Sequence, residues 1–193
     1  MGGSVSLAFS KQTLFNTREH FEAAIAALEK LGYHAPNRPV VISIQLEAYF
    51  FALYACLEFI TISVCDDLAE IQRLPLSYSD LRGDTTFEKA WAYFKLVESR
   101  RTVNAATVKL FNQYHIARNA IAHGVGLNNL VGDKRKRIAN LQGLTSDPED
   151  DSVGMSLEFC TAFYEFGERY IAELEAILKD YGDRLKSRAK SVT

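Results

Sequence analysis

The stretch VISIQLEAYFFALYACLEFITISV, residues Val41–Val64, decides the fold of this 193-residue chain. Apolar side chains occur on most sides of a helix drawn through it, which is typical of a helix enclosed by other helices. Its acidic residues Glu47 and Glu58 disfavour a membrane-spanning segment, because a charged residue at the bilayer centre costs about 2.5–3.5 kcal/mol. We therefore predict a central buried helix over about Val40–Ile71 and no association with a membrane.

Helical periodicity recurs on both sides of this segment, whereas strand signals are nearly absent. Four further helices are predicted: over about Thr17–Leu31, from near Asp84 or Thr85, over Asn104–His123 and over Val153–Tyr181. Residues Leu127–Ser152 form a long polar connection before the last of them. The chain is therefore predicted to be all-α, with about five helices.

Residue types suited to helix ends occur at the borders of these segments. Asn16 is expected to cap the first helix and Thr85 the third, each with a Glu three residues later. Gly124 is expected to end the fourth helix, and the acidic run Asp147–Asp151 to cap the last. The side chains predicted to face the core are Phe21, Ile25, Leu28; Trp91, Phe94, Leu96; Thr107, Leu110, Tyr114, Ala117, Ile121; and Leu157, Cys160, Phe163, Gly167, Ile171, Leu174, Leu178.

The composition suits one globular domain, with hydrophobic residues at 48% and only four prolines. We assign residues 1–193 to this domain and expect residues 1–12 and 186–193 to be flexible. Cys56, Cys65 and Cys160 have no paired spacing and lie among apolar neighbours, so they are expected to be small core residues. The chain begins without a basic or apolar leader, so the reducing cytoplasm is the expected location.

The hexapeptide Arg118-Asn119-Ala120-Ile121-Ala122-His123 stands near the end of the fourth predicted helix. Arg118 is a permanent cation that can hold a phosphate with two donors. His123 can exchange a proton near neutral pH without help from its surroundings. Together these residue types are sufficient for metal-free chemistry on a phosphodiester, and we expect neither a metal nor a cofactor.

Helical spacing predicts a polar face around this motif. If Ala117 points to the core, Asn119 and His123 lie on the opposite side, about 40° apart at roughly 100° per residue. Asn112 and His115 fall in the same sector. One face of the helix would then be buried, and the other would suit the wall of a cleft.

The side chains that line such a cleft could cleave RNA. Removal of the ribose 2′-OH proton produces an oxygen that attacks the adjacent phosphorus, and the leaving 5′ oxygen then needs a proton. His123 suits either proton transfer, and Arg118 suits the charge on the phosphoryl oxygens. Asn119 suits orienting the His or the phosphate by hydrogen bonding. Two histidines would serve the two transfers more easily than one, and a two-fold dimer would supply them.

A purely structural role for the motif stays open, because an Arg and a His near a helix C-terminus also bond carbonyls and complement the helix dipole. The basic run Lys134-Arg135-Lys136-Arg137 suits RNA phosphates, with a solvated loop as the alternative. Because the formal net charge is only −2, any contact with nucleic acid must come from such a local patch.

Glu47 and Glu58 share one face of the central helix but lie about 16 Å apart along it, too far for an acid–base pair. They are expected to line the cleft or to meet basic partners, and one of them could orient Arg118. The sequence contains no spacing typical of a metal site.

The pattern Arg118-Asn119-x-x-x-His123 resembles the R-x4–6-H motif of HEPN domains, with a polar residue directly after the Arg. The place of the motif at the end of an internal helix of an all-α chain agrees with this resemblance. It implies an up-and-down bundle of four or five helices that dimerises, so that two motifs form one composite site. It also implies a metal-independent endoribonuclease in which Arg118 and His123 are catalytic and Asn119 assists them.

Many proteins of this kind are toxins or phage-defence effectors. The resemblance therefore implies an RNA substrate, a homodimer, and restraint by a nucleotidyltransferase-type antitoxin or another regulatory protein. Because some HEPN domains are inactive, the alternative is a HEPN-like module that binds a protein partner or a nucleotide. A third interpretation is a helical scaffold with no role in nucleic-acid binding.

Overall fold

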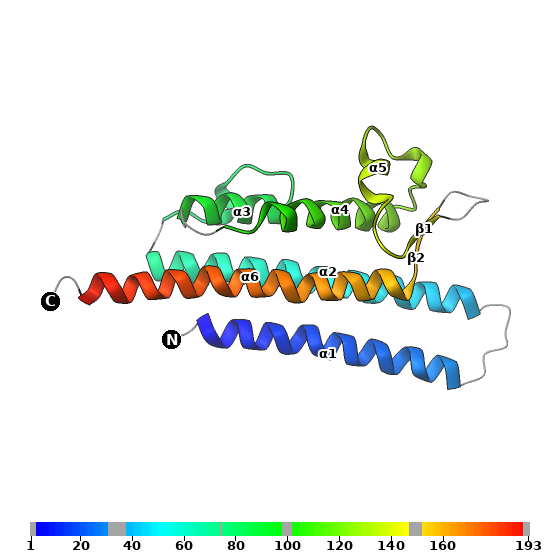
Figure 1. Cartoon of the computed structure of the whole chain (residues 1–193), viewed down its shortest axis with the longest axis horizontal. Coiled ribbons are helices and arrows are strands. Elements are labelled where there is room, and N and C mark those ends of the chain that lie inside the picture. Colours follow the sequence, from blue (N-terminus) through cyan, green and yellow to red (C-terminus); the bar gives the residue numbers. More distant parts are fainter. Residues whose placement is uncertain (1–2, 31–37, 74, 98–101, 147–151, 191–193) are drawn as a thin grey trace. The chain divides into compact units, whose positions relative to one another are not determined.

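The structure is a computed structural model that describes residues 3–30, 38–73, 75–97, 102–146 and 152–190. This part of the chain is mostly helical, which confirms the all-α class (Figure 1). Its helices are α1 Gly3–Lys30, α2 Arg38–Gln72, α3 Thr86–Val97, α4 Ala105–Ala122, α5 Lys134–Ile138 and α6 Leu157–Lys190. Short 3₁₀ turns, η1 Tyr78–Asp80 and η2 Leu127–Asn129, and two strands, β1 Leu144–Ser146 and β2 Val153–Met155, complete it.

Contacts divide the chain into two compact units. The first unit consists of Met1–Thr13, Ala55–Asn104 and Glu168–Thr193, and the second of Leu14–Tyr54 and Ala105–Gly167. Helices α1, α2 and α6 each contribute residues to both units. The assignment of residues 1–193 to one domain stays a prediction. Every residue predicted to be catalytic or to bind RNA belongs to the second unit.

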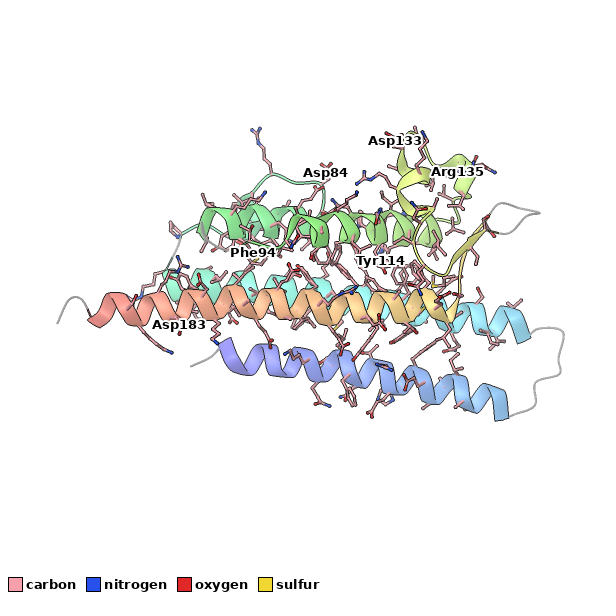
Figure 2. The ribbon with its side chains drawn as sticks, in the orientation of Figure 1. Asp84, Phe94, Tyr114, Asp133, Arg135 and Asp183 are labelled. Carbon is pink, nitrogen blue, oxygen red and sulfur yellow. The ribbon has the colours of Figure 1, made fainter. Side chains whose placement is uncertain are left out.

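An aromatic cluster forms the core of the second unit. The rings of Phe50 from α2 and Tyr114 from α4 lie 4.9 and 4.6 Å from the ring of Phe163 on α6. Figure 2 labels Tyr114 on α4, and its ring also packs against Phe159 and Phe166 of α6. Such ring pairs contribute about 0.5–1.5 kcal/mol each beyond the area they bury. This cluster therefore holds α4, which carries the motif, against α2 and α6 within the unit.

Buried aromatic side chains of α3 occupy the first unit. Trp91 and Phe94 are buried, as predicted, whereas Leu96 is 61% exposed and was assigned to the core wrongly. Thr61, on α2, is fully buried, and its hydroxyl bonds the Leu57 carbonyl at 2.7 Å and the Tyr170 hydroxyl at 2.8 Å. A buried polar group is stable here because it has hydrogen-bonding partners.

Helix α2 corresponds closely to the predicted central helix. Its segment Val40–Ile71 is long and apolar enough to cross a membrane by length and composition, and half of its most apolar window is buried inside the protein. The same helix also exposes the side chains of Val40, Ile44 and Phe59. The helix is therefore enclosed on part of its surface only, and not on most sides as its sequence predicted.

The N-terminal helix begins much earlier than predicted. Helix α1 starts at Gly3 rather than near Thr17, so residues 3–12 are helical and Asn16 lies inside the helix instead of capping it. Helix α6 likewise continues to Lys190, beyond the predicted end at Tyr181. Helix α3 starts close to its predicted border: the Thr85 side chain accepts a 3.1 Å bond from the Glu88 N–H, whereas the Glu88 carboxylate returns to the Asp84 N–H.

The predicted polar connection contains ordered structure that the sequence did not indicate. Helix α5 and strand β1 lie in it, beside the end of α4 (Figure 1). Strand β2 follows directly after it and pairs antiparallel with β1, so that Leu144 is opposite Met155. Val153 is therefore in a strand, and α6 begins at Leu157 after Ser156 instead of at Val153. The acidic run predicted to cap this helix lies outside the described residues.

The buried stripe of α4 agrees with the predicted one at its centre and differs from it at both edges. Phe111 and Ala120 are buried together with Tyr114 and Ala117. Leu110 and Ile121, predicted to be in the core, are only half-buried. Phe111 is buried because its ring packs against Tyr54 of α2 and Phe166 of α6.

Candidate functional site

The end of α4 has the hydrogen bonds of a Schellman motif. Gly124 adopts a left-handed conformation with φ of 58°. Its N–H bonds the Ile121 carbonyl at 3.1 Å, and the Val125 N–H bonds the Ala120 carbonyl at 2.8 Å. Because these bonds satisfy carbonyls of the last turn, His123 is not required as a cap. The imidazole of His123 is exposed at the point where the helix stops.

A chain of side-chain hydrogen bonds connects the motif with α2. Arg118 donates from Nη1 to Oδ1 of Asn119 at 3.0 Å. Nδ2 of Asn119 lies 3.0 Å from Nε2 of His115, and Nδ1 of His115 lies 2.7 Å from the hydroxyl of Tyr54. We call these four residues the amide–imidazole chain. Its hydrogen bonds hold the side-chain amide of Asn119 at both its oxygen and its nitrogen.

Aromatic rings of α2 support the guanidinium of Arg118. Its Cζ lies 5.7 Å from the ring centre of Phe51 and 5.9 Å from that of Tyr54. These distances are within the range of a cation–π interaction, which contributes about 0.5–2 kcal/mol. A guanidinium has five N–H donors, and Asn119 takes one of them. Arg118 can therefore bind an anion through its remaining donors while the two rings and Asn119 hold its guanidinium plane in place.

A pocket of about 320 Å³ lies beside the end of α4. The polar groups on its wall come from His115, Asn119, His123, Asn129 and Lys134, and the apolar ones from Ile116, Ala120, Val125, Leu130 and Val131. Two of the three predicted catalytic residues, Asn119 and His123, therefore border one cavity. The third, Arg118, is not part of its lining and joins it through Asn119.

The two histidines of the pocket differ in their bonding. Both ring nitrogens of His115 face side-chain partners, Tyr54 and Asn119. Among the described residues, the side chain of His123 has no hydrogen-bond partner. An imidazole whose nitrogens are open can take or give a proton at a ligand, so His123 suits proton transfer and His115 suits support.

The basic run forms the short helix α5, not the loop considered as its alternative. All four cations are exposed, and the helix is anchored by Ile138, which is fully buried. Lys134 borders the pocket, whereas Arg135 donates to the side chain of Asn128. Arg135, Lys136 and Arg137 are not part of the pocket lining, and Figure 2 shows Arg135 at the outer side of α5. The run thus presents one cation to the pocket and three to solvent.

The structure assigns no catalytic pairing to the two glutamates of α2. Glu47 lies in the second unit and accepts a bond from the Ser43 hydroxyl at 3.4 Å, whereas Glu58 belongs to the first unit. The hydrogen-bond partner of Arg118 in the described part of the chain is the amide of Asn119, not a carboxylate. The expectation that a glutamate orients Arg118 receives no support from these contacts.

The cysteines have the environment predicted for core residues in two of three cases. Cys65 and Cys160 are buried, and burial raises the pKa of both thiols, that of Cys160 to about 12. Cys56 is half-buried, and burial raises the pKa of its thiol too. All three are free thiols, and none is activated as a nucleophile, because a raised pKa keeps the thiol protonated at neutral pH. Within the described residues, no group of three or more His, Cys, Asp or Glu could hold a metal ion.

Sequence reasoning missed Tyr54 and His115 as members of the site. His115 was placed on the polar face of its helix but received no role, although its spacing of four residues from Asn119 is a signal for contact. Tyr54 lies 61 residues before His115, so no local pattern could have paired them.

Comparison of the chain with models of protein families, with curated proteins and with solved structures finds no match. Fold and site therefore define the class of the protein by themselves. The described part of the chain is an all-α fold with a pocket at the end of α4. This pocket is bordered by the imidazole of His123, which has no hydrogen-bond partner among the described residues, by the ammonium group of Lys134, and by the amide of Asn119, which accepts a bond from the guanidinium of Arg118.

Proposed function

We propose that this protein is a metal-independent endoribonuclease of the HEPN type, acting as a toxin or phage-defence effector. The observation that carries the proposal is the position of Asn119, which bonds Arg118 on one side and borders the pocket with His123 on the other. Anion binding and proton transfer are the two capacities that cleavage of RNA without a metal requires. Both are available within about one and a half turns at the end of α4.

In the proposed reaction, a base removes the proton of a ribose 2′-OH, and the oxygen forms a bond to the adjacent phosphorus. The bond from phosphorus to the 5′ oxygen then breaks, and an acid protonates that oxygen. The products are a 2′,3′-cyclic phosphate and a free 5′-OH. His123 carries one of these proton transfers, and Arg118 stabilises the negative charge on the phosphoryl oxygens. Asn119 holds the guanidinium in position.

A homodimer would supply the second proton-transfer group, because His123 is the histidine of this pocket whose side chain has no hydrogen-bond partner among the described residues. An apolar and exposed strip on α2 supports such a dimer. Val40 and Ile44 are 58% and 57% exposed, and the next two turns expose Ala48 and Ala52. An exposed apolar surface of this kind is typical of an interface.

The basic helix α5 supports RNA as the ligand. Lys134 at the pocket and three further exposed cations would bind the phosphates of a strand that passes the site. An active RNA-cleaving effector in the cytoplasm would need restraint, and an antitoxin of the nucleotidyltransferase type or another regulatory protein would provide it.

The test is an RNA-cleavage assay in the presence of EDTA, with the unaltered protein, Arg118→Ala, His123→Ala and His20→Ala. His20 is an exposed histidine of α1 in the same unit and serves as the matched control. The proposal expects cleavage by the unaltered protein and by His20→Ala, with cyclic phosphate ends, and its loss in the other two variants. Cleavage that persists in Arg118→Ala and His123→Ala would refute the assignment of the site.

A non-catalytic binding module is the second candidate. One observation favours it: the guanidinium of Arg118 is held by Asn119 and two rings and is not part of the pocket lining. In that case, folded unaltered protein binds RNA or a nucleotide without cleaving it. His123→Ala would then leave the biological effect unchanged, which separates the two candidates.

A further inference from the structure

The amide–imidazole chain has a direction that hydrogen-bond chemistry determines. A guanidinium can only donate, so the oxygen of the Asn119 side chain must face Arg118. The nitrogen of the same amide then faces His115, and it also can only donate. Nε2 of His115 must therefore accept, which means that it carries no proton. The remaining nitrogen, Nδ1, carries the proton and donates it to the hydroxyl of Tyr54 at 2.7 Å.

From this geometry we propose that His115 is a positioning residue, held neutral with its proton on Nδ1, that orients Arg118 through the amide of Asn119. The inference rests on the proposed function for its catalytic consequence. Its structural part, the protonation state of one imidazole, is independent of that function. His115 does not transfer protons, because both of its nitrogens are engaged by side chains.

A second proton on His115 would compete with Arg118 for the same atom. An imidazolium donates from both nitrogens, so Nε2–H would oppose the N–H groups of the Asn119 amide. Rotation of the amide by half a turn would give its oxygen to His115 and leave two donors facing each other at Arg118. Protonation of His115 therefore releases the guanidinium from its orienting bond.

The other charged and titratable groups near His115 either disfavour its protonation or have no effect on it. On its own helix these are Arg118 and His123, and from α5 it is Lys134, which borders the same pocket. From α2 it is the phenol of Tyr54, in the hydrogen bond described above. Arg118 and Lys134 disfavour a further positive charge at this place, whereas the phenol of Tyr54 can accept from Nδ1–H in either form and so favours neither.

The direct test is NMR of the full-length protein labelled with ¹⁵N at histidine, because nitrogen chemical shifts distinguish the two neutral forms from imidazolium. In unaltered protein at neutral pH, we expect His115 with its proton on Nδ1 and none on Nε2. A proton on Nε2, in either the neutral or the charged form, would overturn the proposal. This measurement needs no variant and no RNA.

Two variants on α4 then test whether the hydrogen bond from Asn119 keeps Nε2 of His115 unprotonated. In Asn119→Asp, the new carboxylate can only accept, so it should draw a proton onto Nε2 and convert His115 to imidazolium. Asn112→Asp places the same charge on the same helix, three residues from His115 on the other side, and should leave Nε2 unprotonated. If both variants gave the same form of His115, the effect would be one of charge alone, and the orienting bond would be refuted.

The catalytic consequence is tested with His115→Gln and His115→Leu in the RNA-cleavage assay. The amide oxygen of Gln can accept from Asn119, whereas Leu cannot, so Leu should lower kcat about two- to tenfold and Gln should restore much of it. Equal loss in both folded variants would overturn the role in orienting Arg118. Failure of the unaltered protein to cleave RNA would refute the proposed function, while the NMR result would still decide the state of His115.

Discussion

Replacement of Gly124 by Ala tests the end of α4 most directly. Gly124 has φ of 58°, and a Cβ built on it meets no atom within 4 Å. The cost of Ala is therefore conformational and not steric, about 1–2 kcal/mol of the free energy of unfolding for a left-handed non-glycine residue. In a chain of this length, that cost would lower Tm by roughly 2–8 °C.

Gly182 provides the matched control, because it lies inside α6 and its Cβ would also meet nothing within 4 Å. Since Ala is favoured over Gly in a helix interior, Gly182→Ala should raise the free energy of unfolding by about 0.5–1 kcal/mol. Urea unfolding followed by circular dichroism measures both variants. If Gly124→Ala were as stable as the unaltered protein, or if both variants shifted in the same direction, the account of the helix end would be wrong.

Three further changes have expected outcomes. Lys134→Gln should weaken RNA binding and lower the slope of log affinity against log salt by about 1. Lys109→Gln, on the exposed side of α4, should change neither quantity, and fluorescence anisotropy measures both variants. Burial raises the pKa of Cys160 to about 12, so the folded protein keeps a thiol proton that the unfolded chain loses above about pH 9. This contribution to stability is complete below pH 9 and is lost between pH 9 and 12, by at most about 1.4 kcal/mol per pH unit. Cys160→Ala should therefore show a shallower loss of stability in that range, and an unchanged slope would contradict the burial argument. Thr61→Val removes the buried bond to Tyr170 and should lower the free energy of unfolding by about 1–3 kcal/mol in urea titrations; a neutral result would show that the bond does not stabilise the fold.

Several elements could be predicted because their signal is local. Helix α2 was predicted within two residues at each end, since a run of apolar residues of that length has few alternatives to a helix. The end of α4 followed from Gly124, whose left-handed conformation few other residues adopt. By contrast, the early start of α1 was missed, and Lys11 in this part of the helix pairs with Glu175 of α6, which no local pattern could reveal.

The structured connection before α6 was missed for a related reason. Strands β1 and β2 have three residues each, too few to show an alternating pattern, and they exist because they pair with each other. Gly143 shows how closely this segment approaches α6: φ is 73°, and a Cβ there would lie 2.3 Å from the backbone nitrogen of Phe159. Glycine is required here because of Phe159, which is too far along the chain for a local pattern to reveal the contact.

The sequence by itself determined the all-α class and the local order of the motif. Asn119 and His123 are four residues apart on a helix, so helical geometry alone placed them at one pocket. Only the tertiary structure decided the partners of these residues, because they belong to other elements: Tyr54 on α2 completes the chain through His115, and Lys134 reaches the pocket from α5. Periodicity within one helix describes which side chains share a face, whereas packing of the aromatic core decides which way that face turns and what it meets.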